Sequence, residues 1–289
     1  LGNVVLNGAT LSQSTTDSGN YDGYEFIGGT ITVGGSAAST IATGNGSANH
    51  LAGGRVTTFD VADATASTAA DLVVSAPLRD GSNDYPGAGA LRKIGAGTLS
   101  LAAVNSFTGA LTVAGGTLDA TVGSTTGTAS ALGGGSNTIA VNQGATLRLS
   151  GGSRTAGYHS GAVTVDGGTI TFNTTDNNLA EGNTLTFDTA AGTINGTGQW
   201  RRRDANNKVA VTAAASGSTI SVADLNLYDN TPVIEVADGA AADDLAISSS
   251  ITGAAGIGLT KTGAGTLNLT GTNTFSGTAT VAAGTLKVN

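Results

Sequence analysis

The chain has 289 residues and a net charge of −8, with no cysteine and only 11% charged residues. An acidic chain repels nucleic-acid phosphates, no apolar run reaches the roughly 18 residues of a membrane-spanning helix, and disulfides are excluded. Disorder is excluded as well, because apolar residues make up 39% of the chain and recur in short runs between Gly, Asn, Ser and Asp. We therefore expect an ordered all-β chain with no nucleic-acid partner and no transmembrane segment.

One short phrase recurs from the first expected strand to the last: a glycine, with or without a spacer, then Thr followed by Leu or Ile. The Leu or Ile of this phrase is found at Leu11, Ile31, Leu99, Leu118, Leu147, Ile170, Ile194, Ile220, Leu267 and Leu286. Most successive copies are 19 to 29 residues apart, a period typical of stacked structural repeats. Because alternate side chains of a strand face opposite ways, we predict that these residues form one inward column and that the Thr residues point outward. The pattern predicts a parallel β-solenoid of about 12 coils, with residues 1–289 as a single solenoid segment.

Two stretches interrupt this rhythm in the first third of the chain. Residues 12–28 and residues 77–90 are rich in aromatic residues or proline, and the second stretch contains Tyr85. Insertions in solenoids map to loops on one face, which is often the binding face. We predict loops at both stretches, and the alternative to a binding role is a loop that the fold simply tolerates.

Residues 91–120 and residues 259–288 carry a longer and more specific repeat. The two copies are offset by 168 residues without a gap and are identical at 17 of 30 positions. They share the pattern L-x-K-x-G-x-G-T-L-x-L, followed by N-x-F-x-G, T-V and G-T-L. In the first copy we predict a strand with Leu99 inward, a turn that contains Asn105, and Phe107 as a larger plug of the core.

This pattern resembles the autotransporter-associated β-strand repeat, also called the passenger-associated transport repeat, and weaker copies at residues 131–149 and 162–172 extend the resemblance. The resemblance implies a right-handed parallel β-helix within an autotransporter passenger domain, secreted and displayed at or released from the outer-membrane surface of a Gram-negative bacterium. Such passengers are commonly adhesins or stalks that present other domains. Since both ends of the chain fall inside a strand-and-turn pattern, we expect an excised segment of a longer passenger.

Residues 200–204 are the strongest local anomaly, because they hold the only tryptophan and three of the twelve Lys and Arg residues. One interpretation is a protruding loop that binds an anionic glycan or a protein through its arginines and tryptophan. The other is the edge of a coil, in which the arginine stems cover the tryptophan and pair with Asp204. The candidate surface-binding residues are therefore Tyr85, Trp200, Arg201, Arg202 and Arg203.

Catalytic chemistry finds little support in the sequence. There is no cysteine, the only histidines are His50 and His159, and no nucleophile-elbow motif of a serine hydrolase is present. Paired carboxylates could serve a polysaccharide lyase or hydrolase, although turn chemistry accounts for most of the Asp residues. We predict no catalytic residue. The carboxylates that such an enzyme could use are Asp60, Asp63, Asp71, Asp243 and Asp244.

Metal binding is also weakly supported. The oxygen-rich segments 80–84 and 176–178 miss the spacing of an EF-hand, and the tandem glycine–aspartate repeat of calcium-binding β-rolls is absent from the sequence. Solvated turns explain both segments through ordinary turn chemistry. We therefore predict no metal ion and no cofactor.

The sequence as a whole favours a structural or adhesive role. We expect a rigid stalk of an extracellular or cell-surface bacterial protein that displays adhesive surfaces or self-associates, and we expect no enzyme activity. One alternative is a glycan- or protein-binding module that acts through loops 12–28, 77–90 and 200–204, and another is a polysaccharide lyase or hydrolase. The expected partners are host or bacterial surface glycans and proteins, or further copies of the chain.

Overall fold

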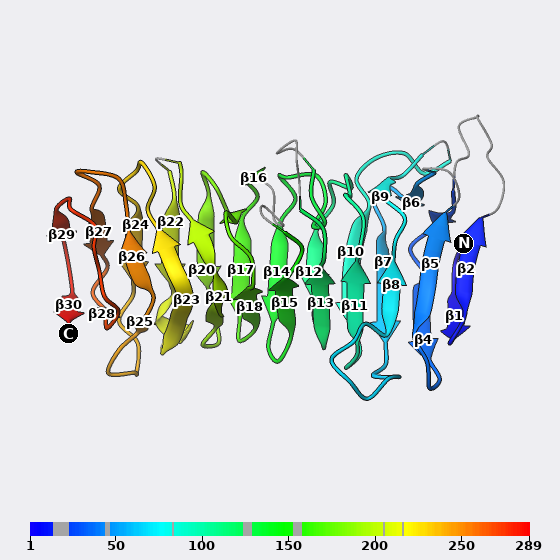
Figure 1. Ribbon diagram of the computed structural model, residues 1–289, viewed down its shortest axis with the longest axis horizontal. Helices are drawn as coiled ribbons and strands as arrows, with labels where there is room; N and C mark the ends of the chain where they lie inside the picture. The colour runs from blue at the N-terminus through cyan, green and yellow to red at the C-terminus, as the bar shows by residue number, and fades with distance from the viewer. Residues whose placement is uncertain are drawn as a thin grey trace.

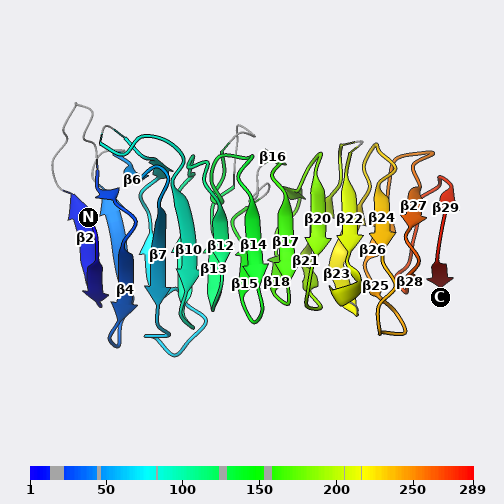
Figure 2. The ribbon, with the colours of Figure 1, turned by 180° about the vertical axis from the view of Figure 1, so that it is seen from behind.

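The computed structural model is an elongated solenoid in which each rung lies beside the one before it (Figure 1). The residues that it describes are 1–13, 23–43, 47–82, 84–123, 129–152, 158–204, 206–215 and 217–289. The chain starts at one end of the stack and finishes at the other, as the view from behind also shows (Figure 2). The predicted fold class, an all-β parallel solenoid, is confirmed, and the predicted number of about 12 coils is close to that of the structure.

The first long sheet takes one short strand from each rung. In order along the stack its strands are β1 (Val4–Asn7), β4 (Thr30–Gly34), β7 (Val56–Val61), β10 (Ala90–Ile94), β12 (Leu111–Val113), β14 (Ile139–Asn142), β17 (Val163–Asp166), β20 (Thr184–Phe187), β22 (Lys208–Val211), β24 (Val233–Val236), β27 (Leu259–Thr262) and β29 (Ala279–Val281). Strand β17 shows why these segments are extended. Its two valines are buried and its Thr and Asp face outward, and β-branched residues suit a half-buried strand.

The second long sheet contains most of the strands that the Gly-Thr-Leu phrase opens. Its strands are β2 (Thr10–Gln13), β5 (Ser39–Thr43), β8 (Leu72–Val74), β11 (Thr98–Leu101), β13 (Thr117–Ala120), β15 (Thr146–Leu149), β18 (Thr169–Phe172), β21 (Thr193–Arg201), β23 (Ser218–Asn226), β25 (Leu245–Ile247), β28 (Thr266–Leu269) and β30 (Thr285–Val288). The aliphatic residues that stand in direct register and are fully buried are Leu99, Leu118, Leu147, Ile170, Ile194 and Ile220. This central part of the predicted column is confirmed.

The predicted column is wrong in its first and last parts. Ile31 pairs with Phe59 in the first sheet, so it belongs to a different column, because the same phrase can open a strand of either sheet. Leu11 lies in the second sheet but pairs with Ile41.

At the far end, Leu267 pairs with Leu245 and Leu286. Ile220 instead pairs with Ile247, so it belongs to another column. Both Leu11 and Leu286 are only half-buried, since the first and last strands of a sheet have a neighbour on one side only.

The third side of the stack is made of short strands. Its elements are β3 (Glu25–Phe26), β6 (Asn49–Leu51), β9 (Leu78–Asp80), β16 (Tyr158–His159), β19 (Asn178–Leu179) and β26 (Ser250–Thr252). Strands β3, β6 and β9 form a small parallel sheet, β16 pairs with β19, and β26 pairs with the far half of β23. The labels of β6, β9 and β16 follow one edge of the solenoid in Figure 1.

Two predicted loops are therefore corrected in part. Residues 12–28 include the end of β2 and the whole of β3, and residues 77–90 include β9 and the first residue of β10. Residues 14–22 and residue 83, which the same predictions covered, lie outside the described residues. Strands of two or three residues contain too little alternation for the sequence to reveal them.

The described residues contain little helix. Within the described residues the only helical element is the single 3₁₀ turn η1 (Ala213–Ala215), so none of them forms a helix that is long and apolar enough to cross a membrane.

Each long repeat spans parts of two rungs. The first copy contains β10, β11, β12 and β13, and the second contains β27, β28, β29 and β30. The next rung thus begins at the Leu-Thr-Val strand β12, which returns the chain to the first sheet. Phe107 is fully buried as predicted, in the turn between the second sheet and the following rung.

Candidate functional site

The long repeat places one lysine of each copy inside the solenoid. Lys93 lies on the inward face of β10 and is fully buried. Its ammonium group donates to the carbonyl oxygens of Ile94 and Gly95, 2.8 and 2.9 Å away, in the turn that follows the strand. It also donates to the carbonyl oxygen of Gly115 at 3.0 Å. Gly115 belongs to the corresponding turn of the next rung, so the lysine connects two rungs.

The second copy repeats this arrangement. Lys261 is fully buried on β27 and donates to the carbonyl oxygens of Thr262 at 2.8 Å and Gly263 at 2.6 Å. Its third acceptor is the carbonyl oxygen of Ala283 at 3.0 Å, again in the turn of the next rung. Gly263 has a φ of 77°, a left-handed conformation that glycine adopts without strain. Because the geometry is the same in both copies, we assign the lysine of the repeat a structural role, which is to join the turns of two successive rungs.

Burial changes the pKa of both lysines. Burial lowers the pKa of Lys93 to about 8, while the negative charges of Asp60 and Asp71 oppose the shift. The pKa of Lys261 is also lowered by burial, against the charge of Asp244. The direction is the one expected for an ammonium group taken out of water.

Two of the carboxylates named for a catalytic role hold the turn that precedes each repeat strand. Asp71 accepts the backbone N–H of Thr98 at 2.8 Å and two N–H groups of residues 64–65 at 2.9 Å. Asp244 accepts the N–H of Thr266 at 2.8 Å. Burial alone would raise the pKa of Asp71, but these hydrogen bonds outweigh it and hold the pKa below its ordinary value. A carboxyl group whose pKa is lowered in this way is ionised at neutral pH and has no proton to donate.

The remaining named carboxylates have other positions or partners. Asp63 is exposed, and Asp60 faces outward on β7, opposite Ile94. Asp243 forms an ion pair with Lys287 at 2.6 Å. The five carboxylates therefore do not converge on one site.

Trp200 and Arg202 point into the solenoid, which corrects the prediction that both lie on the surface. Trp200 is 0% exposed and Arg202 is 2% exposed. The indole ring stacks on Phe172 with 5.9 Å between ring centroids, and the guanidinium group of Arg202 lies 4.9 Å from the Trp200 ring centroid. Trp200 lies near the end of β21 and Arg202 directly follows the strand, so the two residues share one face of the extended chain.

Arg202 is held by backbone carbonyl groups. Its guanidinium donates to the carbonyl oxygen of Leu179 at 3.0 Å and to that of Lys208 at 3.1 Å. Burial lowers the pKa of Arg202 to about 9, while Glu181 opposes the shift. The interpretation in which arginine covers Trp200 is thus closer to the structure than a protruding loop, although the covering is internal.

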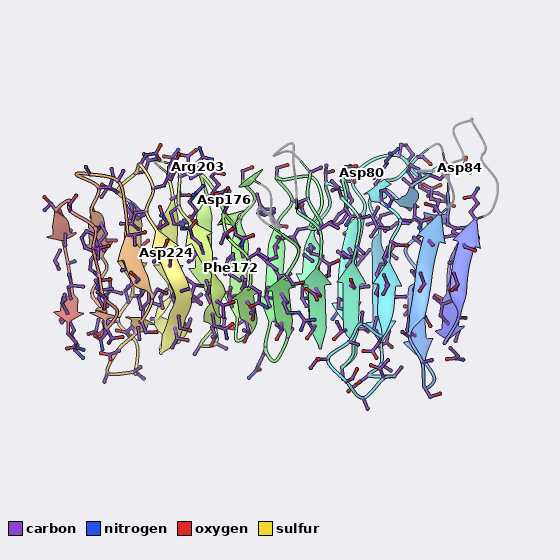
Figure 3. All side chains as sticks on the ribbon, in the orientation of Figure 1. Asp80, Asp84, Phe172, Asp176, Arg203 and Asp224 are labelled. Atoms are coloured by element: carbon purple, nitrogen blue, oxygen red, sulfur yellow. The ribbon has the colours of Figure 1, made fainter. Side chains whose placement is uncertain are left out.

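Arg201 and Arg203 lie on the outer side of the same segment and meet at Tyr228. Their guanidinium carbons are 5.0 and 4.6 Å from the centroid of the tyrosine ring. Arg201 also forms an ion pair with Asp176. Arg203 and Asp176 are labelled close together at the edge of the stack in Figure 3, with Asp224 below them.

An open hollow of about 510 Å³ lies beside this arginine–tyrosine cluster. It crosses three rungs, since Arg201, Asn226 and Thr252 occupy matching positions on β21, β23 and β26. Its lining residues are Arg201, Asn226, Tyr228, Asp229, Thr252, Gly253 and Ala254. We call this the three-rung hollow.

The two segments that contain Lys93 and Lys261 also match a known sequence family. Residues 91–120 and 259–288 match the passenger-associated-transport-repeat family. The chain carries two passenger-associated transport repeats. No curated protein and no solved structure matches the chain. The two repeats and the parallel solenoid resemble those of autotransporter passengers, and the family match covers residues 91–120 and 259–288.

Neither passenger-associated transport repeat contributes to the three-rung hollow, and neither does Tyr85. The guanidinium carbon of Arg55 lies 4.9 Å from the centroid of the Tyr85 ring, and the neighbouring Asp84 is labelled near the N-terminal end of the stack in Figure 3. The five predicted surface-binding residues therefore divide into three groups. Arg201 and Arg203 lie together, Trp200 and Arg202 are internal, and Tyr85 is elsewhere.

The two histidines are also separated. His50 is on β6 and His159 is on β16, in different short sheets of the third side. Burial lowers the pKa of His159 to about 4, against the effect of its hydrogen bond with the carbonyl oxygen of Asn137 at 2.8 Å. His159 is thus a neutral side chain inside the stack at pH 7.

The oxygen-rich segments considered for metal binding have protein partners. The Asp80 carboxylate accepts the N–H of Thr108 at 2.7 Å and that of Gly89 at 3.2 Å, and Asp176 is the partner of Arg201. In the described part of the chain, no group of three or more His, Cys, Asp or Glu side chains is arranged to hold a metal ion.

Asn226, Tyr228 and Thr252 line the hollow, and none of them was predicted as a site residue. All three residues fall within a long gap in the Gly-Thr-Leu rhythm, between Ile220 and Leu267, and this gap was the available signal. The hollow joins residues from three rungs, so no single segment of the sequence contains it.

Proposed function

We propose that this chain is a rigid, adhesive segment of an autotransporter-type passenger at the outer surface of a Gram-negative bacterium, and that it performs no catalytic step. The observation that carries the proposal is the pair of long parallel ladders, which continue from β1 to β29 and from β2 to β30. Hydrogen bonds between rungs run along the axis of the stack, so the solenoid resists bending and can hold other groups away from a cell.

The outward rows of the second sheet support an adhesive role. The threonines that stand in successive register on this sheet are Thr117, Thr146, Thr169, Thr193 and Thr219. Neighbouring strands are about 4.8 Å apart, so these hydroxyl groups form a regular row. A regular row lets many weak contacts act together on a repetitive partner or on a second copy of the chain.

Coated beads test the adhesive part of the proposal. Beads carrying the purified chain, and matched beads carrying albumin, would be mixed with each other and with cultured epithelial cells. We expect the chain-coated beads to form clusters or to adhere to cells well above the albumin level. Clustering and adhesion that both stay at the albumin level would overturn the adhesive role.

A second assay tests the absence of catalysis. The purified chain would be incubated with a panel of polysaccharides, and reducing ends and unsaturated products would be measured. We expect no product above the heat-treated control. Product formation that disappears when Asp243 and Asp244 are replaced by Asn would favour the lyase or hydrolase alternative.

A further inference from the structure

The three-rung hollow has the dimensions of a ligand site. Its volume of about 510 Å³ falls within the range of small-molecule sites, roughly 300 to 1,000 Å³. Arg201, Asn226 and Thr252 follow one another in register, and adjacent rungs are about 4.8 Å apart. The hollow is therefore a short channel along the axis of the stack that presents one polar side chain per rung.

Hydrogen bonds between rungs hold Thr252, one of the lining residues, in place beside the hollow. Asp224 accepts a hydrogen bond from the side-chain amide of Gln199 at 2.5 Å and another from the hydroxyl group of Thr252 at 2.7 Å. One carboxylate thus fixes side chains from the rungs on both sides. Polar groups that are positioned before binding lose less conformational entropy when a ligand arrives.

Tyr228 forms a wall that is also fixed in advance. Its φ of 53° is in the left-handed region, a conformation that is strained for a bulky residue and is found at ligand-binding sites. Its N–H donates to the side-chain oxygen of Asn226 at 2.8 Å, and its carbonyl oxygen accepts the N–H of Ala254 at 2.8 Å. The guanidinium groups of Arg201 and Arg203 over the ring hold the side chain.

The chemistry of the lining selects against a highly charged ligand. The lining contains one cation, Arg201, and one anion, Asp229, and Asp176 already pairs with the cation. The chain as a whole has a net charge of −8, which repels polyanions. Amide, hydroxyl and carboxylate groups beside an aromatic ring instead match a ligand with many hydroxyl groups and apolar ring faces.

We propose that the three-rung hollow binds a neutral saccharide chain that lies along the axis of the stack. The step from one rung to the next is similar in length to one sugar unit of an extended glycan, so successive sugars would meet Arg201, Asn226 and Thr252 in turn. This proposal rests on the proposed adhesive function and names the class of ligand for one surface of the rod.

The test measures binding of the folded chain to immobilised neutral and acidic oligosaccharides. The neutral probes are β-1,4-linked oligomers of glucose, mannose and N-acetylglucosamine, and the acidic probes are polygalacturonate and heparin. We expect at least one neutral oligomer to bind, with an affinity that changes little with salt. Binding to acidic probes alone, or to none, would overturn the proposal.

Variants locate the binding surface. Tyr228→Gly removes the wall while suiting the positive φ, and Thr252→Val removes a hydroxyl group with little change of shape. Each should weaken binding at least about tenfold, as expected for a central contact. Ser221→Ala is the matched control, because Ser221 is exposed on the other half of β23 and its loss should leave binding unchanged. Melting curves would show that each variant folds, and unchanged binding in both hollow variants would refute the assignment.

The outcomes separate this proposal from the proposed function. Beads that adhere while no neutral glycan binds would leave the adhesive stalk standing and remove the saccharide site. If a neutral glycan bound at the hollow while coated beads neither clustered nor adhered, the saccharide site would stand and the adhesive role would be removed.

Discussion

The two passenger-associated transport repeats have closely similar sequences but different surroundings. Phe107 in the first copy is fully buried, whereas its counterpart Phe275 is only partly buried. Val113 is 0% exposed and its counterpart Val281 is 46% exposed. Strand β12 of the first copy lies between β10 and β14, whereas β29 of the second has a partner on one side only. The burial of a residue in this fold is thus determined by the rungs on both sides and not by its own segment.

The lysine differs from the other shared residues. Lys93 and Lys261 each keep three carbonyl acceptors, two in their own turn and one in the next rung. This part of the repeat needs only the rung that follows it, and both copies have that rung. The turn that the lysine holds therefore forms with one neighbouring rung. The apolar core of the repeat needs a rung on each side.

The largest expected effect comes from placing a charge at the matched valines. Val113→Asp would bury an unpaired carboxylate between two rungs and should cost more than about 4 kcal/mol, enough to unfold β10 to β15. Val281→Asp should change the free energy of unfolding by less than about 0.5 kcal/mol, because the side chain is exposed. Hydrogen exchange of the neighbouring strands measures both effects. Equal loss of protection in the two variants would contradict the comparison.

Removal of the matched phenylalanines should give the next largest difference. Phe107→Ala leaves a cavity in the core and should destabilise the stack by about 3–5 kcal/mol. Phe275→Ala should cost clearly less, about 1 kcal/mol, since part of the ring is already in contact with water. Urea unfolding of the two variants beside the parent provides the measurement, and a cost for Phe275 as large as that for Phe107 would show that two neighbouring rungs are not required.

The buried lysine predicts a dependence of stability on pH. Lys93 has a pKa of about 8 in the folded chain and about 10.5 when unfolded, so the unfolded chain binds more protons between these values. The free energy of unfolding should then rise with pH across this window, by up to about 3 kcal/mol. Lys93→Met should remove this rise, and the difference between the two profiles cancels the other titrations. Profiles that stay parallel from pH 8 to pH 10.5 would refute a buried ammonium group.

Much of the fold could be predicted from the sequence, because the glycine of the Gly-Thr-Leu phrase indicates a turn and its Leu or Ile indicates the inward residue of the following strand. The phrase placed Leu99, Leu118 and Leu147 in one column correctly. It misplaced Ile31, since the two long sheets use the same local pattern and only the pairing of rungs distinguishes them. The short strands of the third side were not predicted, because two or three residues are too few to show an alternation of apolar and polar side chains.

The candidate site was harder to predict than the fold. Alternation along a strand places Trp200 and Arg202 on one face and Arg201 on the other, but arginine is rarely internal, so all of them were assigned to the surface. The carbonyl groups that make an internal Arg202 tolerable come from Leu179 and Lys208, which lie in other parts of the sequence. Tyr228 meets Arg201 only because successive rungs bring them together.

The matched asparagines should show the smallest difference and test the role of the second neighbour most directly. Asn105 accepts the N–H of Leu78 at 2.8 Å in the preceding rung and donates to the carbonyl oxygen of Ala131 at 2.6 Å in the following one. Asn273 accepts a single N–H, that of Ile251, at 3.3 Å. Asn105→Ala should therefore leave two buried backbone groups without a partner.

This loss should cost about 1–3 kcal/mol, whereas Asn273→Ala should cost about 0.5 kcal/mol, because water can replace a long hydrogen bond of a half-exposed side chain. Denaturant midpoints measure the two costs, and Asn105→Asp provides a control that keeps the acceptor and loses the donor. If Asn105→Asp at pH 7 were as stable as the parent, the bond to the following rung would contribute nothing. The requirement for two neighbours would then rest on apolar packing alone.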